Sequence, residues 1–271
     1  MSMYHNELSK ERKEYLQKRK RNKTAIMLCR IFIIVAFIAI WEIGGHMGFI
    51  DSFVLSQPSR ILSVLLEYRE NNLLLHIGTT LFETAVGFVL GVVIGTLAAV
   101  LLWWSPFLSK VCEPYLVILN SLPKIALGPV IIIWAGAGTR AIIFMALAIS
   151  MIVTVLEMLN GFHSTDSELI KMLRTFGANR LQVFTKIVLP YNIETLFNSL
   201  KINIGLTLVG VIAGEFLVSK SGLGYLIVYG GQVFKMDLVM ASVIILAVAA
   251  ALLYEFIVIA QRLTLKYLTH N

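Results

Sequence analysis

Six charged side chains stand within or beside long apolar runs of the sequence, where a charge is expensive. They are Glu83, Lys124, Glu157, Lys201, Glu215 and Glu255. Lys124 stands out because Pro123, Gly128 and Pro129 interrupt any helix around it. Broken backbone at membrane depth is tolerated where it lines buried protein or a watery cavity. A cation at such a break is placed to face a passing anion.

We therefore predict five candidates for the lining of a solute pathway: Pro123, Lys124, Pro129, Lys201 and Glu215. An alternative stays open for Lys124. Its charge would then belong to a structural ion pair with a glutamate, or reach the membrane interface along its apolar stem.

Enzyme chemistry finds no support in the sequence. There is no G-x-x-x-x-G-K-[ST] loop to cradle phosphates, no H-E-x-x-H pair and no G-x-S-x-G elbow. The two cysteines, Cys29 and Cys112, have no second cysteine at metal-ligand spacing, and the five histidines are scattered. We predict no catalytic, cofactor or metal site in this chain.

The composition indicates which elements must position these charges. Of 271 residues, 58% are hydrophobic and only 14% are charged, and the mean hydropathy is +0.81. A soluble domain of this length is about 25% charged. Lipid must therefore cover much of this chain, and only helices satisfy their backbone there when the period-2 pattern of a barrel is missing.

The predicted fold is an all-α bundle of six transmembrane helices. The spans lie at about residues 24–49, 73–104, 111–135, 139–159, 193–218 and 236–263. Residues 1–23 form a basic tail, and residues 24–271 form one transmembrane domain. A short interfacial helix is expected within the polar stretch 51–72, and residues 219–235 read as a glycine-rich link.

Glycines four residues apart mark close helix packing. Gly87, Gly91 and Gly95 have this spacing, and Gly210 and Gly214 repeat it. Small residues let two helix backbones approach closely, either within one chain or at the seam between two copies.

The basic residues predict the orientation. With both ends of the chain inside, sixteen of the 23 lysines and arginines fall on the inner side, five on the outer side and two within spans. The positive-inside rule then places both termini in the cytoplasm, at a cell membrane. The charge balance of +7 thus reflects topology rather than nucleic-acid binding. Two alternatives stay open for the basic tail, which either folds onto anionic lipid or stays solvated and disordered.

The inner loop 161–190 reads as two short amphipathic helices hinged at Gly177. Leu169, Met172, Leu173 and Phe176 form one apolar stripe, and Leu181, Phe184 and Val188 form another. Glycine permits a sharp turn between them, and Pro190 suits the first turn of the following span.

This loop resembles the coupling loop of the permeases of ABC importers, whose pattern is E-A-A-x3-G-x9-I-x-L-P. Gly177, Ile187, Leu189 and Pro190 fit that spacing, whereas Lys171, Met172 and Leu173 replace the E-A-A residues. Residues 174–178, R-T-F-G-A, are similar to the R-T-L-G-A stretch of the nitrate, sulfonate and taurine importer group. Other segments, from residue 57 to residue 225, also resemble that group.

The resemblance implies a permease subunit with several partners. These are a second permease copy in a homodimer, two cytoplasmic ATPases that bind ATP and Mg, an external solute-binding protein and membrane lipid. The loop would insert into the ATPase. Its expected coupling residues are Lys171, Met172, Leu173, Arg174, Phe176, Gly177, Arg180, Ile187, Leu189 and Pro190. The solute would be a small anion, such as nitrate, a sulfonate, taurine or bicarbonate.

Three alternatives stay open at this point. Within the same family, the solute is instead a vitamin-precursor heterocycle. From other classes, a stand-alone secondary transporter explains the spans and charges but not the loop pattern, and no inverted repeat is evident. A membrane enzyme is disfavoured because no catalytic constellation is present.

Overall fold

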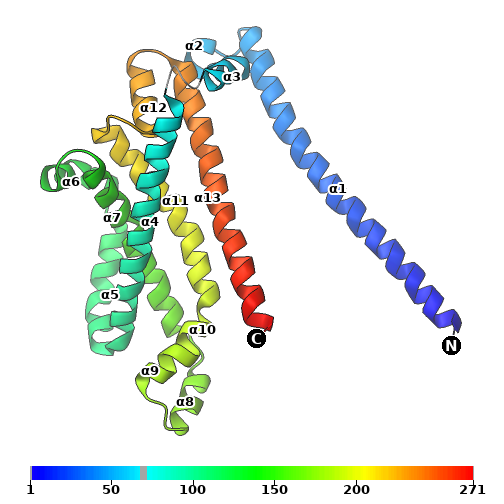
Figure 1. Cartoon of the computed structure of the whole chain (residues 1–271), viewed down its shortest axis with the longest axis vertical. Coiled ribbons are helices and arrows are strands. Elements are labelled where there is room, and N and C mark those ends of the chain that lie inside the picture. The colour runs from blue at the N-terminus through cyan, green and yellow to red at the C-terminus, as the bar shows by residue number, and fades with distance from the viewer. Residues whose placement is uncertain (1, 68–71, 271) are drawn as a thin grey trace. The chain divides into compact units, whose positions relative to one another are not determined.

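The computed structural model describes residues 2–67 and 72–270, and every regular element in those ranges is helical. The chain divides into two units, residues 1–66 and residues 67–271. Figure 1 traces the helices of both. We describe each unit by itself.

The first unit is a long helix followed by two short helices. It contains α1 (Ser2–His46), α2 (Ser52–Leu55) and α3 (Pro58–Leu66). The helix of the predicted first span therefore begins within the basic tail, and α3 is the expected short helix of the polar stretch. Glu42 joins α1 to α3, because its Oε2 accepts a 3.0 Å hydrogen bond from the Ser59 amide.

The second unit contains four long apolar helices. They are α4 (Leu73–Trp104), α7 (Thr139–His163), α11 (Ile193–Val218) and α13 (Met236–His270). Together with α1, five helices in the described residues are long and apolar enough to cross a membrane. A bent pair of helices brings the total to six if the pair is one span, as the sequence predicts.

That bent pair is the predicted third span. It consists of α5 (Pro106–Ser121), the 3₁₀ turn η1 (Lys124–Leu127) and α6 (Gly128–Ala135). The two halves meet at 85°. The cause is local, because Leu122, which precedes Pro123, takes an extended conformation. The break predicted from the prolines is thus a change of direction.

The helices α4, α7 and α11 form the core of the second unit, and the spaced glycines make it compact. A Cβ atom on Gly87 would lie 2.9 Å from the Ala146 Cβ, and one on Gly210 would lie 2.7 Å from the Ala146 Cα. Gly91, Gly95 and Gly214 likewise meet α7, at Ser150, Thr154 and Ile142. Both glycine stripes therefore pack within one chain, which decides between the two alternatives left open by the sequence.

The link after α11 contains a helix that the sequence analysis did not predict. Within residues 219–235, α12 runs from Leu223 to Gln232. Gly222 makes the turn before it with φ of +111°, a backbone conformation that favours glycine. Glycines favour a loop, yet three of the four in this link, Gly224, Gly230 and Gly231, lie inside the short helix.

Candidate functional site

Residues 164–192 join α7 to α11, and we name them the loop segment. It holds α8 (Ser167–Thr175), α9 (Arg180–Val183), the π-helical turn η2 (Phe184–Val188) and α10 (Leu189–Tyr191). It lies at one end of the bundle (Figure 1).

The predicted hinge lies between α8 and α9. Gly177 has φ of +81°, which a side chain would strain. Asn179 and Gln182 then form a capping box that starts α9. The sequence thus predicted two helices turning at Gly177, and the structure has them.

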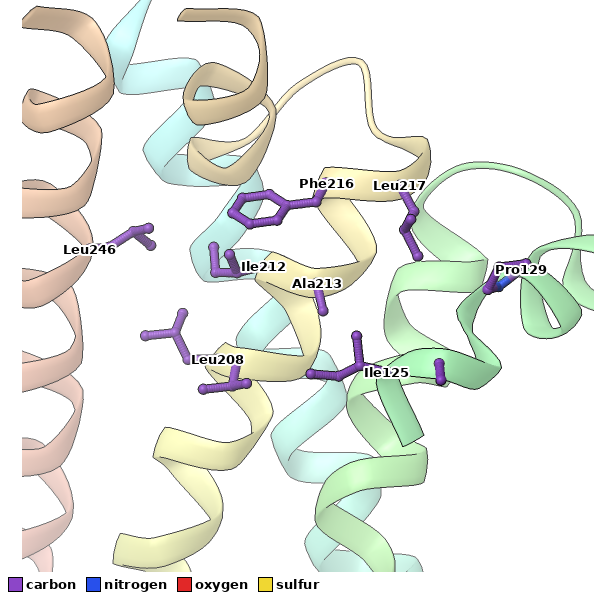
Figure 2. Close-up of a pocket in the computed structure, with 10 residues that line it drawn as sticks. Ile125, Pro129, Leu208, Ile212, Ala213, Phe216, Leu217 and Leu246 are labelled. Atoms are coloured by element: carbon purple, nitrogen blue, oxygen red, sulfur yellow. The ribbon is translucent and has the colours of Figure 1, made fainter. Parts of the chain in front are cut away.

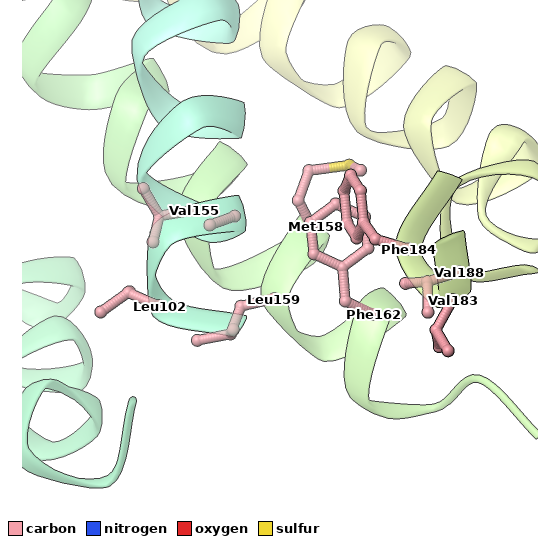
Figure 3. Close-up of a cluster of buried hydrophobic side chains, with 9 residues drawn as sticks. Leu102, Val155, Met158, Leu159, Phe162, Val183, Phe184 and Val188 are labelled. Carbon is pink, nitrogen blue, oxygen red and sulfur yellow. The ribbon is translucent and has the colours of Figure 1, made fainter. Parts of the chain in front are cut away.

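One side of the loop segment packs against the bundle through a buried apolar cluster (Figure 3). Val183, Phe184 and Val188 of the segment meet residues of α4 and α7. The residues contributed by those two helices are Ala99, Leu102, Val155, Met158, Leu159 and Phe162. Phe184 and Phe162 meet edge to face, with ring centroids 5.5 Å apart. The loop segment is therefore packed against α4 and α7.

Arg180 adds a polar contact to the same attachment. Its guanidinium lies over the rings of Trp103 and Trp104, 5.4 Å and 5.7 Å from their centroids. It also donates a 3.2 Å hydrogen bond to the Trp103 carbonyl. The structure thus joins Arg180 to the end of α4, a contact that sequence spacing does not reveal.

The two ends of the loop segment are joined by Asn192. Its Nδ2 donates to the Thr165 Oγ1 at 2.9 Å and to the Val188 carbonyl at 2.8 Å. Asn192 and Thr165 are both buried. We call this contact the clasp, because it holds the start and the end of the segment together.

The other side of the loop segment is apolar and uncovered in this chain. Its exposed side chains are Leu169, Met172, Phe176 and Leu181. Phe176 beside the hinge is 80% exposed. The predicted stripes therefore divide between two faces, since Phe184 and Val188 pack inward while these residues face outward.

The other predicted coupling residues surround that uncovered face. Lys171 is exposed and pairs with Glu168 at 2.9 Å, and Arg174 is exposed beside it. Leu173 packs against the buried cluster. Ile187 is half-buried, whereas Leu189 and Pro190 are exposed.

A wholly apolar cavity of about 660 Å³ lies where the broken span meets α11 and α13 (Figure 2). Ile125, Ala126 and Pro129 form one wall, residues of α11 form the opposite wall, and Leu246 comes from α13. Among the predicted pathway residues, Pro129 alone lines this cavity. Its walls offer a polar solute no hydrogen-bond partner.

The two predicted pathway lysines bind neighbouring asparagines. Lys124 donates from its Nζ to the Asn120 carbonyl at 3.0 Å and so caps the end of α5. Lys201 donates to the Asn198 Oδ1 at 3.2 Å. Neither lysine takes part in an ion pair within the described residues, so Lys124 stabilises the break through backbone contact.

Glu215 lies inside the protein, at the end of the bundle away from the loop segment. Its Oε1 accepts a 2.6 Å hydrogen bond from the Thr80 hydroxyl, and its Oε2 accepts one of 2.5 Å from the Gly224 amide. Thr80 in turn accepts from the Leu223 amide at 2.8 Å. Glu215 thus fastens α11 to α4 and to the start of α12.

A helical bundle that crosses a membrane and holds a compact, half-covered loop segment at one end has the architecture of a transport permease. Residues 91–266 match the family described as "Binding-protein-dependent transport system inner membrane component". The chain belongs to that family, and it is an integral membrane component of an ABC importer rather than an enzyme.

Relatives and solved structures agree. The chain is 25% identical to the putative aliphatic sulfonates transport permease protein of Bacillus subtilis, over 96% of this chain and 95% of that protein. It is 26% identical to the formylaminopyrimidine transport permease protein of Halalkalibacterium halodurans, over 76% and 81%. A bacterial alginate ABC transporter, solved with an alginate-bound periplasmic protein, shares the fold with a TM-score of 0.62 and 17% identity, over 89% and 93%.

Proposed function

We propose that this chain forms the translocation pathway of an ATP-driven importer and that the loop segment couples it to ATP hydrolysis. The two faces of the loop segment carry this proposal. One face is packed into the bundle around Phe184, and the other presents exposed apolar side chains around Phe176. An exposed apolar patch on a fixed support is typical of a protein-binding surface.

The proposed assembly contains two copies of this chain, two ATPases on the cytoplasmic side and an external solute-binding protein. ATP and Mg bind the ATPases, and this chain binds neither. The alginate transporter, which was solved with a periplasmic protein, supports the binding-protein partner. ATP drives the cycle only if the assembly binds it more tightly in one state of the pathway than in the other.

The proposed orientation places both termini and the loop segment in the cytoplasm. The excess of inner lysines and arginines supports it. The basic residues of the tail then lie near the anionic inner leaflet.

The proposed solute is a small anion of the nitrate, sulfonate, taurine or bicarbonate kind. The relative from Bacillus subtilis, named for aliphatic sulfonates, supports it. The second candidate is a vitamin-precursor heterocycle, which the relative named for formylaminopyrimidine favours. In either case the external protein selects what reaches the pathway.

Reconstitution tests the assignment. We expect the chain to co-elute with its ATPase and to support ATP-dependent uptake in vesicles that also contain the binding protein. Uptake by the chain alone, driven by an ion gradient, would instead identify a secondary transporter and refute the proposal.

The hinge provides a sharper test. Gly177→Pro imposes φ near −65° where the chain needs +81°. We expect ATP-dependent uptake to fall at least tenfold, as an order-of-magnitude estimate, while the amount of chain in the membrane is unchanged. Unchanged uptake would remove the loop segment from the coupling mechanism.

A further inference from the structure

The place where α4 turns into α5 lies beside the loop segment. We call Trp103, Trp104, Ser105 and Pro106 the corner. Ser105 is the single residue between the two helices, and its hydroxyl accepts a 3.3 Å hydrogen bond from the Leu108 amide, which caps α5. A connection of one residue cannot absorb much movement. A shift at the end of α4 must therefore shift the start of α5.

Arg180 joins the loop segment to the corner by two kinds of contact. Its Nη2 donates a 3.2 Å hydrogen bond to the Trp103 carbonyl, and its guanidinium carbon lies 5.4 Å and 5.7 Å from the centroids of the two tryptophan rings. The last carbonyls of a helix have no partner within that helix, and a cation beside them is favourable. A lysine lacks the flat group that stacks on rings while it donates from its edge. The contact therefore depends on arginine in particular.

Arg180 also stands next to the face of the loop segment that is left for a partner. It is the first residue of α9 and follows the hinge at Gly177 by three positions. The next residue, Leu181, belongs to the uncovered face and is 58% exposed. Because both residues lie in the first turn of one helix, a partner that moves the uncovered face also moves Arg180.

The helix α5 connects the corner to the apolar cavity. It has 16 residues, about 24 Å of helix, and it starts at the end of the bundle where the loop segment lies (Figure 1). Cys112 and Leu116 of α5 pack against the buried cluster that contains Phe184. The helix ends at the break, and Ile125 just beyond the break lines the cavity. The corner and one wall of the cavity thus lie at the two ends of the same helix.

We propose that Arg180 is a positioning residue, which passes movement of the loop segment to the corner and through α5 to the cavity wall. The inference rests on the proposed function and deepens it. It separates the residues that receive the ATPase from the residue that transmits its movement. Arg180 then acts inward, on the end of α4, rather than as a contact of the ATPase, which is the role that the family resemblance implies.

A thiol on the cavity wall reports the movement whatever the solute is. In a background with Cys29→Ser and Cys112→Ser, Ile125→Cys places a thiol in the cavity, and N-ethylmaleimide is the probe. The complex of the full chain with its ATPase is labelled with and without ATP and Mg, and the label on this chain is measured. We expect ATP to change the labelling rate about fivefold or more, the lower range for coupling between two sites. In Arg180→Ala this change should disappear, while co-elution with the ATPase and ATP hydrolysis persist.

Two other arginines serve as controls. Arg140→Ala removes an exposed arginine at the start of α7, outside the proposed route, and should keep the ATP-dependent change. Arg174→Ala, on the exposed side of the loop segment, should weaken co-elution but keep the change in the complexes that form. If Arg180→Ala folds poorly, Arg180→Lys keeps the positive charge without the flat stacked group, and it should reduce the change at least about twofold.

Three results would overturn the proposal: an ATP-dependent change that persists in Arg180→Ala, a loss of co-elution by folded Arg180→Ala, or no change in the chain with Arg180 while its ATPase hydrolyses ATP. A purely structural role is distinguished by the ratio of the two labelling rates, because it alters both rates equally and leaves their ratio as before. Failure of the proposed function is visible earlier. A chain with Arg180 intact that never associates with an ATPase refutes the importer role and this inference together.

Discussion

The buried side-chain amide of Asn192 joins both ends of the loop segment. Its Nδ2 reaches the hydroxyl of Thr165 and the carbonyl of Val188. Val188 is also packed in the buried cluster, so what this amide adds is the link to Thr165. An asparagine at this position has a structural reason independent of any solute.

Removing the clasp should destabilise the chain. In Asn192→Ala the buried Thr165 hydroxyl loses its partner, so we expect a loss of about 1–3 kcal/mol in the free energy of unfolding. Thermal unfolding in detergent measures it. The double variant with Thr165→Ala should cost less than the sum of the single changes, and strict additivity would contradict the contact.

Two glycines of α11 offer a matched comparison. Gly210→Ala places a methyl group 2.7 Å from the Ala146 Cα, which cannot move aside, and overpacking of this kind costs about 1–3 kcal/mol. Gly205 lies five residues earlier in the same helix, and a Cβ atom added there has nothing within 4 Å. Gly205→Ala should leave the melting temperature unchanged or raise it, since alanine favours helix. Equal losses in both variants would disprove the close approach.

At the scale of elements, the loop segment has two faces with different tasks. The Phe184 face attaches it to α4 and α7, and the Phe176 face is left for a partner. Stability and coupling should therefore respond to different substitutions.

The two phenylalanines test this division. Phe184→Ala should lower the free energy of unfolding by about 3–5 kcal/mol, because it opens a cavity in the buried cluster. Phe176→Ala should leave the melting temperature unchanged and weaken co-elution with the ATPase. Thermal unfolding and co-elution, measured on both variants, check the pair. A stability loss in Phe176→Ala would show that the exposed face is not free.

The break between α5 and α6 is the other feature at this scale. The prolines predict that the span is interrupted, and the extended Leu122 turns the chain, but the sequence does not predict that α6 then packs against α7 and α11 at 85° to α5. A helix period indicates which residues share a face and carries no information on the direction taken after a break.

At the scale of the whole molecule, the orientation is open to a direct test. Two variants are made in a background with Cys29→Ser and Cys112→Ser. Lys171→Cys places one exposed thiol in the loop segment, and Lys220→Cys places one at the opposite end of the bundle, after α11. We expect a membrane-impermeant maleimide to label position 220 on intact cells and position 171 only after permeabilisation. The reverse pattern would invert the topology.

Much of the fold follows from local pattern. The helices α4 and α11 have the bounds that hydropathy predicts, and the four-residue glycine spacing identifies helices that pack closely. The hinge at Gly177 was also predicted, because a sharp turn between two amphipathic stripes needs a special residue.

The features that escaped prediction depend on residues far apart in the chain. Thr165 and Asn192 are separated by 27 positions, and Arg180 reaches a tryptophan 77 positions away. A polar pocket has one wall from α7, including Asn160, and another from α11, including Asn198. A charge inside an apolar run, such as Lys124, is visible in a sequence, whereas two uncharged asparagines 38 positions apart are not.

The clasp has a consequence for how such proteins diversify. A segment whose entry and exit are fastened to each other behaves as a cassette: it can be exchanged without altering the spacing of the helices that carry it. Swapping residues 166–191 for those of a relative, with Thr165, Asn192 and the inward-packed Val183, Phe184 and Val188 retained, should change which ATPase the chain binds and leave the transported solute unchanged. A single ATPase would then serve permeases that transport different solutes.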